Sequence, residues 1–322
     1  MRARCLAWLL VPTLAFAPAS AADPPKKPFI ARTHVVAPLQ FGDFVLEGTR
    51  YDPANKFAGV AIRYFVPGQE ATRIDLFVYP NGRSESVEAL DQGMRDFRAT
   101  LDAAERAGYY RNLEVADAVE FDIPLPSSLP GAPEAAPSDD ATAESPEAAP
   151  AGDDTEEGGR IAMLAGLLGK DRRIDGRMIR LAYDYPGQVD GEWLPMHSRG
   201  YLFYHHLYFF KGRISAAESR IDATAFAALA DRAMRELVPA VQAYNVGSCG
   251  DTSIHVDLNA PEKARMEALM RDLVAAQVRG EANNCHPDPK GADIAALSDG
   301  AEVVVIEYEP GDWNSAQPPA AR

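Results

Sequence analysis

The stretch 199-RGYLFYHHLYFFKGRIS-215 decides the fold, because it carries the densest set of aromatic residues in the chain. Its length exceeds that of a usual strand, so we interpret it as a hairpin of two strands that turns near His205 and His206. Aromatic side chains bury large apolar areas, which places most of this hairpin in a core. Any part left exposed would be the best candidate for a binding surface. The residues of that candidate surface are Tyr201, Phe203, Tyr204, Tyr208 and Phe210.

Upstream of the hairpin, three strand-like runs precede the clearest amphipathic helix of the sequence. The runs 44–46, 60–66 and 74–79 are rich in β-branched and aromatic residues and are separated by turn residues. The helix has one apolar stripe at spacings of three and four, and a glycine follows it. The stripe consists of Val87, Leu90, Met94, Phe97, Leu101 and Ala104. A returning strand over 113–123 completes the order expected when a helix covers an antiparallel sheet.

Downstream of the hairpin, the sequence predicts two more helices and further strands. One helix begins after Asp222, a good N-cap residue, and the other begins near Pro261. Strands are predicted over 178–185, 254–258 and 303–308 from their β-branched and aromatic content. The two halves of the chain therefore have a similar composition of strands and helices.

A composition break separates the two halves. Residues 124–159 consist mainly of Pro, Ala, Ser, Asp and Glu, so they cannot bury enough apolar area to offset their chain entropy. We predict an α+β protein with antiparallel sheets and helices packed on one face. Its two lobes, 23–123 and 160–315, are joined by this disordered acidic linker, and residues 316–322 form a loose tail. The length is compatible with two domains or with one domain that carries a long insertion.

The first 22 residues have the layout of a secretory signal peptide. A basic start is followed by an apolar run over 6–16 and by small residues, with cleavage expected near Ala21 or Ala22. The apolar run is shorter than the roughly 20 residues that a membrane-spanning helix needs. We therefore predict a periplasmic or secreted protein whose mature chain has no membrane span.

The net charge of the chain indicates which kinds of partner it can bind. The formal net charge is −15, and no cluster of Lys and Arg occurs in the sequence. Binding to nucleic acids requires such clusters to face the phosphates, so we expect no nucleic-acid partner. Anionic membrane surfaces are disfavoured for the same reason.

Cysteine usage agrees with export. Cys5 lies within the signal peptide, so the mature chain retains Cys249 and Cys285. An even pair of cysteines in an oxidising compartment predicts a disulfide bond. The alternative is a reactive thiol at Cys249, which has a glycine on either side at positions 247 and 250.

The best chemical pattern in the sequence is a His-x-Asp pair. If 251–257 is a strand, Asp251, His255 and Asp257 lie on one face of it. His255 and Asp257 have the spacing of two ligands in non-haem iron sites, and a disulfide would bring His286 near them. Asp251, His255 and Asp257 are also candidates for acid–base catalysis. A solvated edge strand shows the same alternation, however, so a purely structural role is the competing interpretation.

No catalytic template fits the chain. We find no nucleophile elbow, zinc helix, Walker loop or dinucleotide fingerprint, and we expect no cofactor. The sequence therefore favours an exported, non-enzymatic binding or interaction protein of the bacterial envelope, with an envelope protein or a small molecule as its partner. The alternative is a secreted hydrolase or metal-dependent enzyme that uses His255, Asp257 and His286.

Overall fold

The computed structural model describes residues 29–125, 173–187, 191–249, 261–286, 288, 290 and 294–313. The predicted signal peptide, nearly all of the acidic linker, the strand over 254–258 and the tail over 316–322 lie outside the described residues. The described part is an α+β structure with two larger sheets and a short third one.

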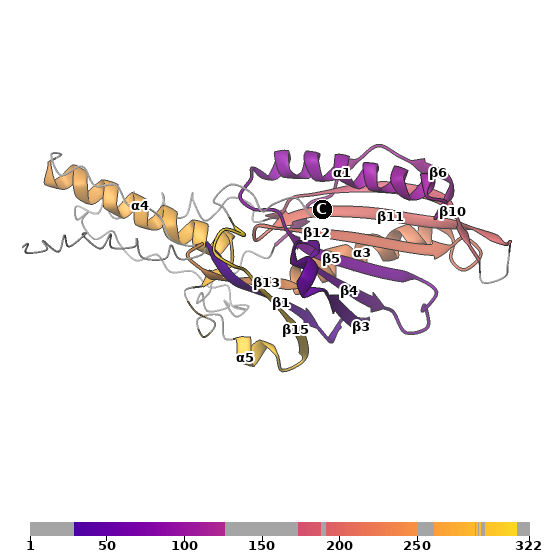
Figure 1. Cartoon of the computed structure of the whole chain (residues 1–322), viewed down its shortest axis with the longest axis horizontal. Helices are drawn as coiled ribbons and strands as arrows, with labels where there is room; N and C mark the ends of the chain where they lie inside the picture. Colours follow the sequence, from indigo (N-terminus) through magenta and orange to yellow (C-terminus); the bar gives the residue numbers. More distant parts are fainter. Residues whose placement is uncertain are drawn as a thin grey trace, which may run out of the picture.

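The larger sheet has nine strands, all in antiparallel pairs (Figure 1). In spatial order the strands are β2 (Gln40–Phe41), β3 (Phe44–Tyr51), β4 (Val60–Phe65), β5 (Arg73–Pro80), β12 (Tyr208–Ala217), β11 (Trp193–His205), β10 (Gly176–Pro186) and β6 (Arg111–Val115), while β7 (Val119–Glu120) also pairs with β10. β5 belongs to the first predicted lobe and β12 to the second, and they pair over eight residues from Tyr208–Pro80 to Ser215–Arg73. The two predicted lobes therefore share one sheet.

The predicted aromatic hairpin is confirmed as β11 and β12. His205 pairs with Tyr208, so the turn consists of His206 and Leu207. Both turn residues have positive φ, at 52° and 71°, as required by the tight turns that match the twist of a hairpin.

The helices α1 (Ser86–Arg106) and α3 (Ala223–Ala240) cover opposite faces of the larger sheet. Leu202 of β11 belongs to the core beneath α1, whereas the next residue, Phe203, belongs to the core that includes α3. The prediction that the helices pack on one face is therefore wrong for this sheet. The physical reason lies in the hairpin sequence, which is apolar at successive positions and thus has two faces to bury.

A second, four-stranded sheet has the order β14 (Cys285–His286), β13 (Gln242–Gly247), β1 (Ile30–Pro38) and β15 (Ala301–Glu307). Only β13 and β14 are parallel in it. Buried hydroxyl groups join the two sheets, because Tyr208 Oη donates to Thr33 Oγ1 at 2.7 Å and lies 2.8 Å from Tyr308 Oη. The remaining elements are η1 (Pro53–Ala58), β8 (Ile123–Pro124), β9 (Arg173–Ile174), α4 (Glu262–Ala282) and α5 (Ile294–Leu297). Within the described residues, no helix is long and apolar enough to cross a membrane.

The described residues on either side of 126–172, a range that contains most of the predicted acidic linker, meet at the short sheet of β8 and β9. Ile123 pairs with Ile174, and Pro124 pairs with Arg173. The described residues that flank 126–172 therefore lie in adjacent strands.

Candidate functional site

The predicted His-x-Asp site can be followed only in part. Asp251, His255 and Asp257 lie outside the described residues. His286 is in β14, where its Nε2 is 2.9 Å from Asn284 Oδ1 and its ring packs against Tyr244. Burial lowers the pKa of His286 below its ordinary value of 6.5. Among the described residues, no group of three or more His, Cys, Asp or Glu side chains could hold a metal ion.

Cys249 and Cys285 lie at disulfide-bonding distance, with their Cα atoms 5.9 Å apart. The predicted pairing is therefore confirmed. Cys249 is 1% exposed and joins the main core, so its environment is that of a structural cysteine and not of an accessible thiol.

The aromatic hairpin does not form the candidate binding surface. Tyr201, Phe203, Tyr208 and Phe210 are fully buried. Tyr204 is partly exposed, and its hydroxyl donates to the carbonyl oxygen of Gly82 at 2.6 Å. These residues build the core between the sheet and its helices, so this prediction of a surface is wrong.

A groove of about 300 Å³ lies elsewhere on the larger sheet, on the face that carries α1. α1 packs on β6, β10 and β11, while the groove is lined by β3, β4 and β5. A bulge in β3 helps to shape it, because Leu46 pairs with Tyr64 but Gly48 pairs with Arg63. A Cβ atom at Gly48 would meet no atom within 4 Å, so this position leaves open space.

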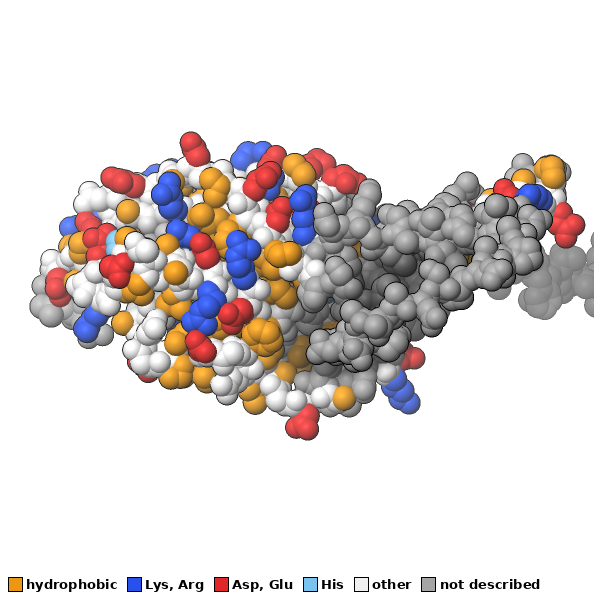
Figure 2. Space-filling model, turned by 180° about the vertical axis from the view of Figure 1, so that it is seen from behind, with side chains coloured by type: hydrophobic (Ala, Val, Ile, Leu, Met, Phe, Trp, Pro, Cys, Tyr) orange, Lys and Arg blue, Asp and Glu red, His pale blue; other side chains and the backbone are white. Residues whose placement is uncertain are grey.

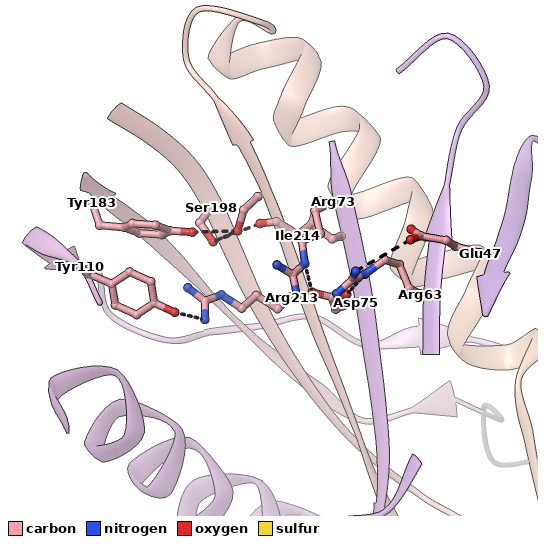
Figure 3. Close-up of polar contacts among 10 residues, drawn as sticks. Glu47, Arg63, Arg73, Asp75, Tyr110, Tyr183, Ser198, Arg213 and Ile214 are labelled. Atoms are coloured by element: carbon pink, nitrogen blue, oxygen red, sulfur yellow. Dashed lines mark hydrogen bonds and ion pairs between the residues drawn. The ribbon is translucent and has the colours of Figure 1, made fainter. Parts of the chain in front are cut away.

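Three charged side chains form the centre of the groove (Figure 3). Asp75 is only 8% exposed, and its two carboxylate oxygens accept from two arginines. Arg63 Nε lies 2.7 Å from Oδ1, and Arg73 Nε lies 2.6 Å from Oδ2. The hydrogen bond to Asp75 is the main cause that raises the pKa of Arg63. We call these three residues the arginine clamp.

A second polar group lies beside the clamp on the same face (Figure 3). Arg213 Nη1 donates to Tyr110 Oη at 2.6 Å, and its guanidinium lies over the rings of Tyr110 and Tyr183. Tyr183 Oη donates to Ser215 Oγ at 3.0 Å, and Ser215 Oγ is 2.8 Å from Ser198 Oγ. The hydroxyl groups of Tyr183, Ser215 and Ser198 are thus engaged with one another, whereas the partners of Arg213 in the described part of the chain are uncharged.

Lys211 precedes this arginine by two residues and points to the same face. Its Nζ lies 5.1 Å from the ring centre of Phe77, 5.3 Å from that of Phe97 and 5.7 Å from that of Tyr79. Burial, and next the charge of Arg213, lower the pKa of Lys211. The groove and this neighbouring group together contain the buried carboxylate of Asp75, the exposed carboxylate of Glu47 and five cationic side chains: Arg50, Arg63, Arg73, Lys211 and Arg213.

The sequence contained a signal for these residues. Charged residues stand at alternate positions of otherwise apolar strands, as in 73-RID-75 and 211-KGR-213. Such alternation indicates a polar face, but the pairing of the strands is needed to show that the faces coincide.

A larger hollow of about 520 Å³ lies near the hairpin turn and the first turn of α1. It is bordered by Leu125 and Arg173, the residues next to the segment that is not described. The groove at the clamp, by contrast, is lined by residues well within the described ranges.

No family model, no curated protein and no solved structure matches this chain. The function has to be argued from the site alone.

Proposed function

We propose that this chain is an exported, non-enzymatic binding protein of the bacterial cell envelope that holds an anionic group of its ligand in the groove. The observation that carries the proposal is the arginine clamp. Asp75 is bonded to the Nε atoms of Arg63 and Arg73, and Glu47 Oε1 lies 3.9 Å from Arg63 Nη1, so the other terminal nitrogens of the two guanidinium groups can donate to a further acceptor. Planar guanidinium groups bind carboxylate and phosphate through paired, charge-assisted hydrogen bonds.

The clamp is ordered before a ligand arrives. Holding a long side chain in one geometry costs conformational entropy, and the bonds to Asp75 meet that cost in the folded protein. The side chains of Arg63 and Arg73 remain 40% and 56% exposed. They are therefore oriented and accessible, which suits a binding site better than a purely structural ion pair.

The surroundings favour a small polar ligand over a nucleic acid. The chain as a whole has a net charge of −15, which repels polyanions at long range. On the face of the molecule seen in Figure 2, basic, acidic and hydrophobic side chains are mixed, with several Lys and Arg side chains near the middle of the described surface. A local cationic site in an acidic protein selects a ligand by its fit and not by its charge alone.

Export is supported by two independent observations. The first residues have the layout of a signal peptide, and Cys249 lies at bonding distance from Cys285. Disulfide bonds persist in the oxidising environment of the periplasm and the cell exterior.

The test is calorimetric titration of the mature protein with inorganic phosphate and with acetate. Each of Arg63→Gln and Arg73→Gln should weaken binding about 10-fold, because one charge-assisted hydrogen bond contributes about 1.5 kcal/mol. Arg220→Gln is the matched control, since Arg220 is exposed and lies outside the groove. Thermal melting should show that all three variants fold.

Two results would contradict the proposal. One is the absence of any binding by either anion at low salt. The other is equal loss of affinity in the Arg220→Gln control, which would indicate a diffuse effect of net charge.

A further inference from the structure

The register of the larger sheet places a second arginine directly beside the clamp. Asp75 of β5 is paired with Arg63 of β4 on one side and with Arg213 of β12 on the other. Directly paired residues point to the same face of a sheet. Two strand spacings of about 4.8 Å separate the backbones of Arg63 and Arg213, which places them about 10 Å apart.

Arg213 is half-buried, and no negatively charged partner is found for it among the described residues. Asp75 is engaged by Arg63 and Arg73, and in the described part of the chain no ion pair joins Arg213 to a carboxylate. Its Nη1 donates to Tyr110 Oη, and the rings of Tyr110 and Tyr183 lie 4.9 and 5.5 Å from the guanidinium carbon. Contacts with aromatic rings offset only part of the cost of removing a cation from water.

Lys211 likewise has no negatively charged partner among the described residues. Three aromatic rings surround its ammonium group, and no ion pair to a carboxylate is found for it among the described residues. Lys211 and Arg213 also repel each other, since they are two residues apart on one face of β12. Two neighbouring, partly buried cations are costly without a counter-charge, so an anion that binds beside them would offset part of that cost.

Phe77 links this pair to the clamp. Its ring lines the groove and also contacts Lys211, which is its direct partner on β12. A ligand that reaches from one cationic pair to the other must pass over this ring. The part that joins its two anionic groups is therefore expected to be apolar or flat.

We propose that Lys211 and Arg213 form a second anion-binding subsite, so that the ligand of this protein carries two anionic groups about 10 Å apart. This proposal rests on the function proposed for the clamp, and it specifies the chemical class of the ligand as a dianion. It fits an amphipathic dianion whose ends bind two arginine-containing subsites and whose middle packs on Phe77.

The experiment compares inorganic phosphate with a series of alkane diphosphates of increasing length. When both subsites are filled by one molecule, the second contact becomes intramolecular, so the best diphosphate should bind about 100-fold more tightly than phosphate. The gain should peak at one chain length and fall for longer and shorter ones.

The variants separate the two subsites. Lys211→Met keeps the apolar contacts with the rings, and Arg213→Gln removes the charge beside Tyr110. Either change should reduce the gain, and both together should abolish it, while the affinity for phosphate at the clamp stays the same. Arg95→Gln is the control, because Arg95 is exposed on α1 and bonds to Gln92.

The outcomes are distinguishable. If phosphate binds and no diphosphate binds more tightly, the second subsite is refuted and the clamp stands. If the gain survives in the folded double variant, Lys211 and Arg213 are not its source. If neither probe binds, both proposals fail.

Discussion

At the residue scale, His34 is expected to make the stability of the protein depend on pH. It lies in β1, is 9% exposed, and its Nε2 has no hydrogen-bond partner in the described part of the chain. Burial, and next the charge of Arg32, lower the pKa of His34 below its ordinary 6.5. The unfolded chain therefore binds a proton before the folded one does, and the free energy of unfolding should decrease as the pH falls below 6.5.

Thermal melts at a series of pH values, together with an NMR titration of the His34 ring, measure this effect. His34→Gln should flatten the part of the pH dependence that lies just below 6.5, although the partly buried His286 contributes in the same direction. A titration of His34 above 6.5 in the folded protein would contradict the prediction.

The residues of the groove show what the sequence could not supply. The disulfide of Cys249 and Cys285 could be predicted from two considerations, the oxidising compartment expected for an exported protein and the presence of two cysteines in the mature chain. Arg213 and its partner Tyr110 are 103 positions apart, so their contact depends on which strands of the sheet are neighbours. No periodicity within one segment contains that information, and the sequence analysis accordingly selected the histidines.

At the scale of elements, the contact of α1 with the sheet depends on the absence of a side chain at Gly200. A Cβ atom at Gly200 would lie 2.6 Å from the ring of Phe97 on α1 and 3.1 Å from Ile179. Gly200→Ala should therefore destabilise the protein by about 1–3 kcal/mol, because the helix or the ring has to move. Urea denaturation measures this loss.

Gly280→Ala provides the matched control. The chemical change is the same, but a Cβ atom at Gly280 of α4 would meet no atom within 4 Å. Alanine is favoured over glycine inside a helix, so this variant should be as stable as the parent or slightly more stable. Equal destabilisation by both changes would show that the contact with Phe97 is not the cause.

The elements themselves were largely predictable, whereas their arrangement was not. The stripe of α1 and the turn of the aromatic hairpin follow from local spacing, and both are present in the structure. The placement of α1 and α3 on opposite faces depends on a hairpin that is apolar on both sides. An alternation of polar and apolar residues shows which face of a strand is buried only where the other face is polar.

At the scale of the whole molecule, the central question is whether the acidic segment joins two lobes or interrupts one. β5 pairs with β12, β1 pairs with both β13 and β15, and one core cluster contains residues from both parts. We therefore expect that neither part of the chain buries its apolar surface alone. We expect a single cooperative unfolding transition for the mature protein, and no cooperative transition for the isolated 29–125 fragment.

Replacement of residues 126–172 by a short glycine-containing turn is a second test of whether the two parts of the chain form one cooperative unit. Pro124 and Arg173 are already paired, so a tight turn can close the chain between β8 and β9 without moving either strand. A shorter loop loses less entropy on closure, which should stabilise the shortened protein by about 2 kcal/mol. Calorimetry should therefore show one transition at an equal or higher temperature, and phosphate binding at the clamp should be unchanged. If the segment were instead a spacer between independent lobes, its removal would strain their connection, and the isolated 29–125 fragment would melt cooperatively by itself.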